Sequence, residues 1–198
     1  KPLRSLHGES TRLSDVHGIA LDVKNKLMFV TNWGHVSDYS TAGTGRFEDP
    51  SISVYPMNAD GDAAPMRVIR GPKTQLNWPA QMAIDPDTGN LYIANDIGQS
   101  VLVFDSKSQG DAEPIRVVKG NKTRLANPSG VAVDSKNKEV WVSSFGNASA
   151  SAFSLTANGN VAPIRTIRSA PENKVSLKFG KVEALAYDEA RDQIWVPN

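Results

Sequence analysis

Cysteine is absent from this chain of 198 residues. Its absence excludes disulfide bonds, a cysteine nucleophile, iron–sulfur clusters and thiolate zinc sites. No apolar run approaches the roughly 18 residues that would cross a bilayer, so we expect no membrane insertion. Neither sign of charge is in excess, because 22 Lys and Arg residues stand against 21 Asp and Glu residues. This balance gives no electrostatic reason to expect a nucleic-acid partner.

An internal repeat is what the chain does contain. A segment with proline first and arginine third occurs at 65–71, 114–120 and 163–168, at intervals of 49 residues. An earlier copy at 2–8 lies 63 residues before the first of these. After each copy comes an apolar motif that closes on an aspartate, namely Asp22, Asp85, Asp134 and Asp188. Self-similarity of this kind is the signature of a repeat architecture.

Each repeat holds four short runs of β-branched and aromatic residues, separated by Gly, Pro, Asn and Asp. These are strand and turn signals. The turn between the third and fourth runs is centred on Gly61, Gly110 and Gly159, where we expect positive φ. Four antiparallel strands in about 40–50 residues describe one blade of a β-propeller. We therefore predict an all-β propeller built of four-stranded antiparallel blades.

The predicted blades form an incomplete ring in a single domain over 1–198. Its parts are an outer strand at 1–8, blades near 16–71, 80–120 and 129–169, and a partial blade at 182–198. Repeats of this length usually close as rings of about five to seven blades. We expect the missing blades to come from a longer chain or from a second subunit, because an open edge strand invites aggregation.

Side chains that recur in register predict how the blades pack together. Four aromatic residues of the second strands are expected to lie between blades: Phe29, Tyr92, Trp141 and Trp195. Burial is also expected for the aromatic residues that end the third strands: Tyr55, Phe104 and Phe153. Ion pairs between blades, or protection of strand edges, are expected from the recurring Arg4, Arg67, Arg116 and Arg165.

The repeat resembles the NHL-repeat β-propellers, of the six-bladed, gluconolactonase-like superfamily. The resemblance is carried by PSGVAVD at 128–134, YIAN at 92–95 and SVLVFD at 100–105, and it extends over essentially the whole chain. Propellers of this kind serve as protein-binding platforms, as carbohydrate- or RNA-binding modules, and as lyases and lactonases. The resemblance therefore implies the fold and leaves the function open.

Topology places one residue of each blade at the mouth of the channel. The first strand begins where the second ends, so the residue five before each closing aspartate lies there: His17, Ala80, Ser129 and Glu183. By resemblance to gluconolactonases and peptide-amidating lyases, His17 and Glu183 are candidate ligands for a divalent ion, Ca²⁺ or Zn²⁺. Ala80 and Ser129 offer no comparable ligand. The alternative is a solvated channel lined by polar residues.

An insertion of 14 residues makes the first repeat longer, and it falls between Asn32 and Ile52 on the same face. Long loops on rigid scaffolds are disproportionately functional. The candidate ligand-binding residues in it are Trp33, His35, Asp38, Tyr39, Arg46, Phe47 and Glu48. Aromatic and charged side chains together favour a recognition surface for protein or sugar. The alternative is a tolerated surface insertion.

Two functions follow from these patterns. The first is a non-enzymatic binding or scaffold module that recognises a protein, peptide or glycan through the loop-bearing face. The second is a metal-dependent lactonase, hydrolase or lyase with a divalent ion at the channel mouth. Because bacterial propellers of this repeat class are often exported, we expect a secreted or periplasmic location.

Overall fold

In the computed structural model, the described residues are 2–37, 41–43, 45–171, 173–176, 178, 180 and 182–197. They form strands, turns and four short 3₁₀-helices, and no helix among them is long and apolar enough to cross a membrane. The 3₁₀-helices are Glu9–Thr11, Pro72–Thr74, Asn121–Thr123 and Phe145–Asn147. The all-β prediction is confirmed.

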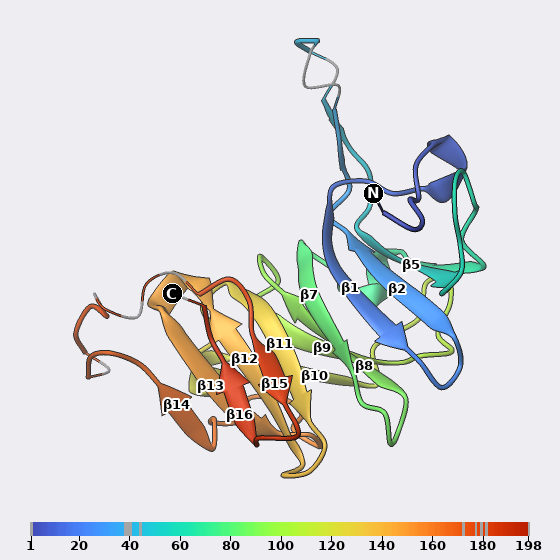
Figure 1. Ribbon diagram of the computed structural model, residues 1–198. Coiled ribbons are helices and arrows are strands. Elements are labelled where there is room, and N and C mark those ends of the chain that lie inside the picture. The colour runs from blue at the N-terminus through green and yellow to red at the C-terminus, as the bar shows by residue number, and fades with distance from the viewer. Residues whose placement is uncertain are drawn as a thin grey trace.

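Three four-stranded antiparallel sheets stand in a row and are followed by a two-stranded hairpin (Figure 1). The first blade has β1 (Val16–Asp22), β2 (Leu27–Asn32), β5 (Ser51–Pro56) and β6 (Arg67–Arg70). The second has β7 (Pro79–Ile84), β8 (Asn90–Asn95), β9 (Ser100–Asp105) and β10 (Arg116–Lys119). The third has β11 (Pro128–Asp134), β12 (Glu139–Ser144), β13 (Ser149–Ser154) and β14 (Arg165–Ile167). The last hairpin is β15 (Ala186–Asp188) with β16 (Gln193–Trp195).

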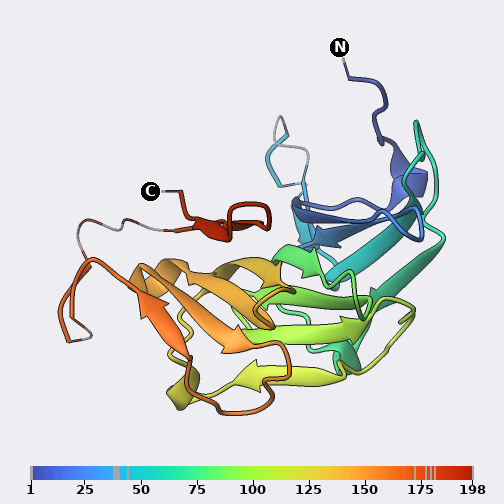
Figure 2. The same cartoon turned by 60° about the horizontal axis from the view of Figure 1, so that its bottom comes forward.

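The row of blades curves without closing, and its two ends lie apart (Figure 2). This arrangement confirms the prediction of an incomplete ring. One further hairpin, β3 (His35–Val36) paired with β4 (Arg46–Phe47), lies within the predicted insertion. The sequence did not indicate it, because strands of two residues carry no alternating pattern.

Apolar packing between neighbouring sheets holds the blades together. Phe29 of the first blade lies in one cluster with Met82 and Ile93 of the second, and Tyr92 lies in another with Val131 of the third. Six of the aromatic residues predicted to be buried are at most 6% exposed: Phe29, Tyr92, Trp141, Tyr55, Phe104 and Phe153.

Trp195 departs from this pattern, and its predicted burial is wrong. Its side chain is 60% exposed. The matched Trp141 is covered by Leu185 of the next hairpin, whereas no described element covers the corresponding side of β16. The position is therefore apolar in every repeat and buried only where another blade follows.

Backbone bridges add a second link between blades. The outermost strand of one blade pairs in parallel with the turn glycine of the next, as Leu6 with Gly61, Ile69 with Gly110 and Val118 with Gly159. The three glycines have φ of 62°, 62° and 74°, as their turns require. Leu6 belongs to the N-terminal segment, so this segment occupies the place of the outermost strand of a preceding blade.

Among the residues that the structure describes, Arg4, Arg67 and Arg116 form none of the ion pairs that were expected between blades. Their guanidinium groups instead donate to carbonyl oxygens of the next blade, Arg67 to Ser106 at 2.5 Å and Arg116 to Leu155 at 3.0 Å. Arg4 makes the matching bond to Met57 at 3.4 Å. Ion-pair formation is seen at Arg165, which pairs with Glu139 of its own sheet. At these three junctions, a backbone carbonyl oxygen therefore accepts the arginine hydrogen bond that a carboxylate was expected to accept.

Candidate functional site

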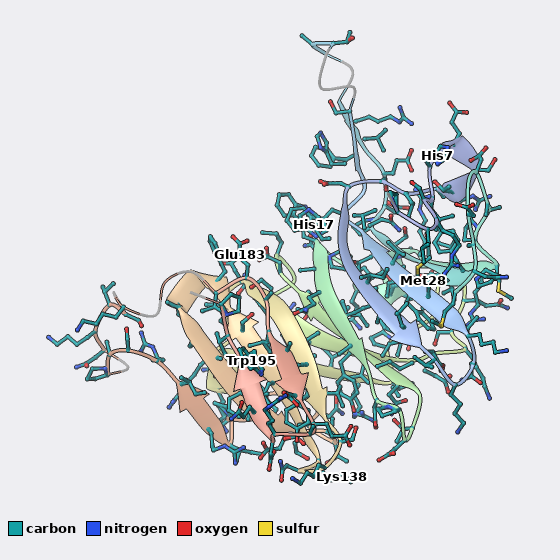
Figure 3. All side chains as sticks on the ribbon, in the orientation of Figure 1. His7, His17, Met28, Lys138, Glu183 and Trp195 are labelled. Carbon is teal, nitrogen blue, oxygen red and sulfur yellow. The ribbon has the colours of Figure 1, made fainter. Side chains whose placement is uncertain are left out.

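The four mouth positions surround one cavity of about 450 Å³. Its walls include His17, Ala80, Ser129 and Glu183, together with Trp33, Gln81 and Asp96. Figure 3 shows His17 and Glu183 at the same end of the sheets. Repeat register alone located these positions, because it fixes where each first strand begins.

A stack of three aromatic rings lies beside the cavity, and two of them, His17 and Trp33, line it. The imidazole of His17 lies parallel to the indole of Trp33, with ring centroids 3.3 Å apart. Trp33 also stacks on Trp78, the residue that precedes β7, at 4.4 Å. The indole Nε1 of Trp33 is buried without a hydrogen-bond partner among the described residues. The stack joins the first blade, its insertion and the second blade.

Asp15 orients the histidines beside this stack. One carboxylate oxygen of Asp15 lies 3.3 Å from Nε2 of His17, and the other lies 4.0 Å from Nδ1 of His35. The Asp15 carbonyl oxygen also accepts the backbone N–H of Trp33 at 3.1 Å. One residue therefore holds the mouth histidine and the base of the insertion together.

Sequence reasoning missed Asp15 and Trp78, although the register contains a signal for them. Asp15, Trp78 and Asn127 each precede a mouth residue by two positions. All three have positive φ, of 50°, 55° and 48°. A non-glycine residue rarely adopts this conformation, so the three positions mark the tight entry into each first strand.

The hairpin β3–β4 projects beyond the ends of the neighbouring sheets (Figure 1). Phe47 is 73% exposed on it, although its ring lies 5.1 Å from the ring of His35. Arg46 and Glu48 form an ion pair at 3.3 Å on the same hairpin. The remaining two candidates in the insertion, Asp38 and Tyr39, lie outside the described residues.

Several polar groups of the cavity wall are already used by the fold. The Gln81 side chain donates to the carbonyl oxygen of Leu185 at 3.1 Å and accepts the N–H groups of Val131 and Leu185. The Ser129 hydroxyl donates to the carbonyl oxygen of Val182 at 2.9 Å. The Gln81 bonds fasten the third blade and the residues before the last hairpin to the second blade, and the Ser129 bond fastens those residues to the third blade.

Glu183 keeps its carboxylate available to a ligand, whereas one ring nitrogen of His17 is already paired with Asp15. Glu183 is exposed, and its carboxylate makes no hydrogen bond or ion pair to another described residue. Nε2 of His17 is turned to Asp15. Within the described ranges, no group of three or more His, Asp or Glu side chains is placed to hold a metal ion. His17 and Glu183 supply two donors, and a catalytic zinc site has three protein ligands, so an ion held here would need at least one further ligand.

Known structures share the propeller fold. One is a nidogen–laminin complex, matched at 15% identity and TM-score 0.60 over 92% of this chain and 56% of that one. Another is hydrazine synthase of Kuenenia stuttgartiensis, at 14% identity and TM-score 0.62 over 96% and 44%. A third is the WD40-repeat domain of RRP9, at 14% identity and TM-score 0.60 over 98% and 53%. The chain thus spans about half the length of these structures.

Family comparison is more specific. A comparison with curated proteins found no match. The profile of the family described as "Lactonase, 7-bladed beta-propeller" matches residues 34–176, which is most of the chain. This agrees with the gluconolactonase-like resemblance, with seven blades in place of the six-bladed type. The chain belongs to the lactonase family of seven-bladed β-propellers.

Proposed function

We propose that this chain is a binding module that recognises a protein, peptide or glycan through the face bearing β3–β4. The observation that carries the proposal is the exposure of Phe47, at 73%, on a hairpin that projects beside the channel mouth. A large apolar side chain held in solvent by a defined hairpin is typical of an interaction site.

The base of the hairpin supports this role because it is fixed before any partner arrives. Trp33 is held by stacking on His17 and Trp78, and its backbone N–H donates to the carbonyl oxygen of Asp15. At the other side of the hairpin base, the N–H of Glu48 donates to the carbonyl oxygen of Gly34 at 2.7 Å. A preorganised surface loses less conformational entropy on binding than a flexible loop.

Binding can be tested by screening the chain against a glycan array and a peptide library. The best hit is then titrated by calorimetry against Phe47→Ala and a matched control, Ile97→Ala. Ile97 is 46% exposed and lies in the equivalent connection of the second blade. We expect Phe47→Ala to weaken binding at least about tenfold, as for an interface hot spot, and Ile97→Ala to leave it unchanged. Equal affinities for all three proteins would exclude the hairpin as the binding surface.

A second candidate function is lactone hydrolysis. It is supported by the family match and by the pairing of His17 with Asp15 at 3.3 Å on a cavity that also holds Glu183. In this reaction His17 would accept a proton from water as the water oxygen attacks the lactone carbonyl carbon. The ring C–O bond then breaks, the proton passes to the leaving alkoxide, and a hydroxy acid results.

Turnover of a panel of lactones distinguishes the two candidates. The assays are run with chelator and with added Ca²⁺ or Zn²⁺, because the proposed hydrolase would use a divalent ion at the channel mouth. If the chain is a hydrolase, His17→Ala should reduce turnover by about a hundredfold or more. His7→Ala, on the remote outer segment, should leave turnover intact. If no lactone is turned over under any condition, lactone hydrolysis is contradicted and the binding module remains the proposed function.

We also propose a secreted or periplasmic location, supported by the resemblance to exported bacterial propellers. Fractionation of cells that express the native gene, followed by immunodetection, tests it. Recovery of the protein in the periplasm or medium would support the proposal, and recovery only in the cytoplasm would contradict it.

A further inference from the structure

A second cavity, of about 880 Å³, lies between segment 8–14, the β3–β4 hairpin and the outermost strand of the first blade. We name this space the rim cavity. Three arginines and three carboxylates line it: Arg12, Arg46, Arg70, Glu9, Glu48 and Asp49. Apolar side chains also reach it, namely Leu13, Val36 and Val68. Sites for small organic ligands typically measure about 300–1,000 Å³, so the rim cavity has the size of such a site.

The arginines of the rim cavity are as accessible as their counterparts in the second blade, which has a complete sheet before it. Arg12 and Arg70 are exposed in the first blade. The residues at the matched repeat positions of the second blade, Gln75 and Lys119, are exposed too. Exposure therefore belongs to the repeat position and does not depend on what precedes the first blade. What the first blade adds is the β3–β4 hairpin, which supplies the remaining wall.

Ion pairs fix the wall that the hairpin contributes. The Glu48 carboxylate lies 3.3 Å from the guanidinium group of Arg46 and 3.9 Å from that of Arg70. The Asp49 carboxylate lies 3.8 Å from Arg70. Both contacts of Arg70 are longer than hydrogen bonds, so its N–H groups can still donate to a ligand. On the opposite wall, the Arg12 side chain makes no hydrogen bond or ion pair to a described residue.

The lining of the rim cavity matches the hydrogen bonding of sugar hydroxyl groups. Guanidinium groups only donate and ionised carboxylates only accept, whereas a hydroxyl group does both. A cavity that presents three of each can therefore satisfy both roles of several hydroxyl groups. The formal charges of these six side chains cancel, which favours a neutral ligand over an ionised one. Leu13, Val36 and Val68 can meet the C–H groups of a sugar ring.

An extended peptide fits the rim cavity less well, because the strand edge beside it is already occupied. Peptides that add to a sheet need free backbone groups along its edge. At β6, the N–H of Arg70 donates to the carbonyl oxygen of Gly110 at 2.9 Å. The N–H of Gly110 in turn donates to the carbonyl oxygen of Val68 at 2.7 Å. The turn of the second blade thus takes the place that a peptide strand would need.

We propose that the rim cavity binds a short neutral oligosaccharide, with Arg12 and Arg70 donating to its hydroxyl groups and Glu9 accepting from them. This inference rests on the proposed binding role of the β3–β4 face and names the ligand class. Both sequence neighbours of Phe47 line the cavity. Because successive side chains of a strand point to opposite faces, Phe47 lies on the other face of β4. The cavity and Phe47 can therefore be tested separately.

Calorimetric titration with maltotriose, cellotriose, mannotriose and triacetylchitotriose tests the proposal. We expect at least one of these trisaccharides to bind, with an affinity that changes less than about twofold between about 0.05 M and 0.5 M salt, because the ligand carries no charge. Arg12→Ala and Arg70→Ala should each weaken this binding by more than about tenfold, because each removes charge-assisted hydrogen bonds. The matched controls, Gln75→Ala and Lys119→Ala, should bind like the unchanged chain. Circular dichroism verifies that all variants remain folded.

Phe47→Ala separates this proposal from the function on which it rests. Loss of trisaccharide binding in both arginine variants supports the rim cavity, whatever the effect of Phe47→Ala. A peptide or glycan whose affinity falls in Phe47→Ala, but not in Arg12→Ala or Arg70→Ala, would overturn the cavity as the site and leave the binding module in place. Binding of none of the trisaccharides, a strong salt dependence, or equal losses in the control variants would each overturn the proposal as well.

Discussion

The imidazole ring of His17 lies parallel to the indole ring of Trp33, with centroids 3.3 Å apart and planes inclined by 4°. His17 lies at the start of β1 and Trp33 directly follows β2, so both lie at the open end of this antiparallel hairpin. Trp78 of the next blade extends their stack. The channel mouth is therefore formed by contacts across a blade junction as well as within one blade. A ligand that reaches His17 meets a ring already fixed in orientation.

Removing the central ring of this stack should destabilise the protein. We expect Trp33→Ala to lower the free energy of unfolding by about 1–3 kcal/mol, less than for a fully buried tryptophan because Trp33 is half-buried. Trp33→Phe should lower the free energy of unfolding less than Trp33→Ala does, because a phenyl ring can still stack on His17 and Trp78. Phe47→Ala, at a side chain that is 73% exposed, is the control and should change stability little. Urea unfolding followed by circular dichroism measures all three, and equal losses in Trp33→Ala and Phe47→Ala would contradict the expectation.

Gln81 should control the attachment of the last hairpin. Its side chain bonds to both backbone groups of Leu185 and to the N–H of Val131. Gln81→Leu leaves these groups without partners, at a cost of about 1–3 kcal/mol for each buried one. Gln81→Glu retains an acceptor for the two N–H groups and should cost less. We expect faster amide hydrogen exchange over 182–196 in Gln81→Leu, with exchange in β8 and β9 unchanged. Uniform acceleration through all blades would show that Gln81 acts on global stability instead.

The arginines at successive blade junctions should contribute differently to the free energy of unfolding, although they occupy matching positions in the repeat. Arg116 donates at 3.0 Å to both the Tyr92 hydroxyl and the Leu155 carbonyl oxygen, whereas the exposed Arg4 makes one bond of 3.4 Å. Burial raises the pKa of the Tyr92 hydroxyl, so this group stays a neutral partner at physiological pH. We expect Arg116→Met to cost about 1–3 kcal/mol of unfolding free energy and Arg4→Met less than about 0.5 kcal/mol. Thermal unfolding of the two variants under one buffer gives the comparison, and a larger loss at Arg4 would reverse this ranking.

Repeat register predicted most of the fold because it reports strand ends directly. Residues at the same distance from the closing aspartate of each repeat take the same place in successive sheets, so the burial of Tyr92 and the mouth position of Glu183 both follow from counting. Counting also placed Trp195 between blades, where it is not. Register identifies the surface that a side chain faces, and it cannot say whether another blade covers that surface.

The parts of the site that the sequence did not indicate depend on backbone conformation and on contacts that do not recur from one repeat to the next. Asp15 and Trp78 occupy equivalent positions with positive φ, yet they differ in side-chain chemistry, so no residue type signals them. The β3–β4 hairpin occurs once in the chain and has no other repeat for comparison. His35 and Phe47 come together only because that hairpin forms.

Docking of the N-terminal segment should depend on pH through Asp60. Its carboxylate accepts the N–H of Ser5 at 2.8 Å. Backbone hydrogen bonds from Ser5 and Gly61 lower the pKa of Asp60 below its ordinary value of 3.8. Because the pKa is lower in the folded chain than in the unfolded one, the ionised carboxylate favours docking above the unfolded value. That contribution is lost as the pH falls through the lowered folded value.

The third blade supplies the matched control for this prediction. At the equivalent turn, the Asn158 side chain accepts the N–H of Val117 at 3.0 Å without a titratable group. Asp60→Asn should therefore keep the segment docked at neutral pH and remove the titration of the Ser5 amide. We expect the Ser5 amide resonance of the unchanged protein to shift as the pH falls below the ordinary carboxyl pKa of 3.8, and that of Asp60→Asn to stay constant. If both proteins titrate alike, a different acidic group governs the segment, and if Asp60→Asn is undocked at pH 7, the amide does not substitute for the carboxylate.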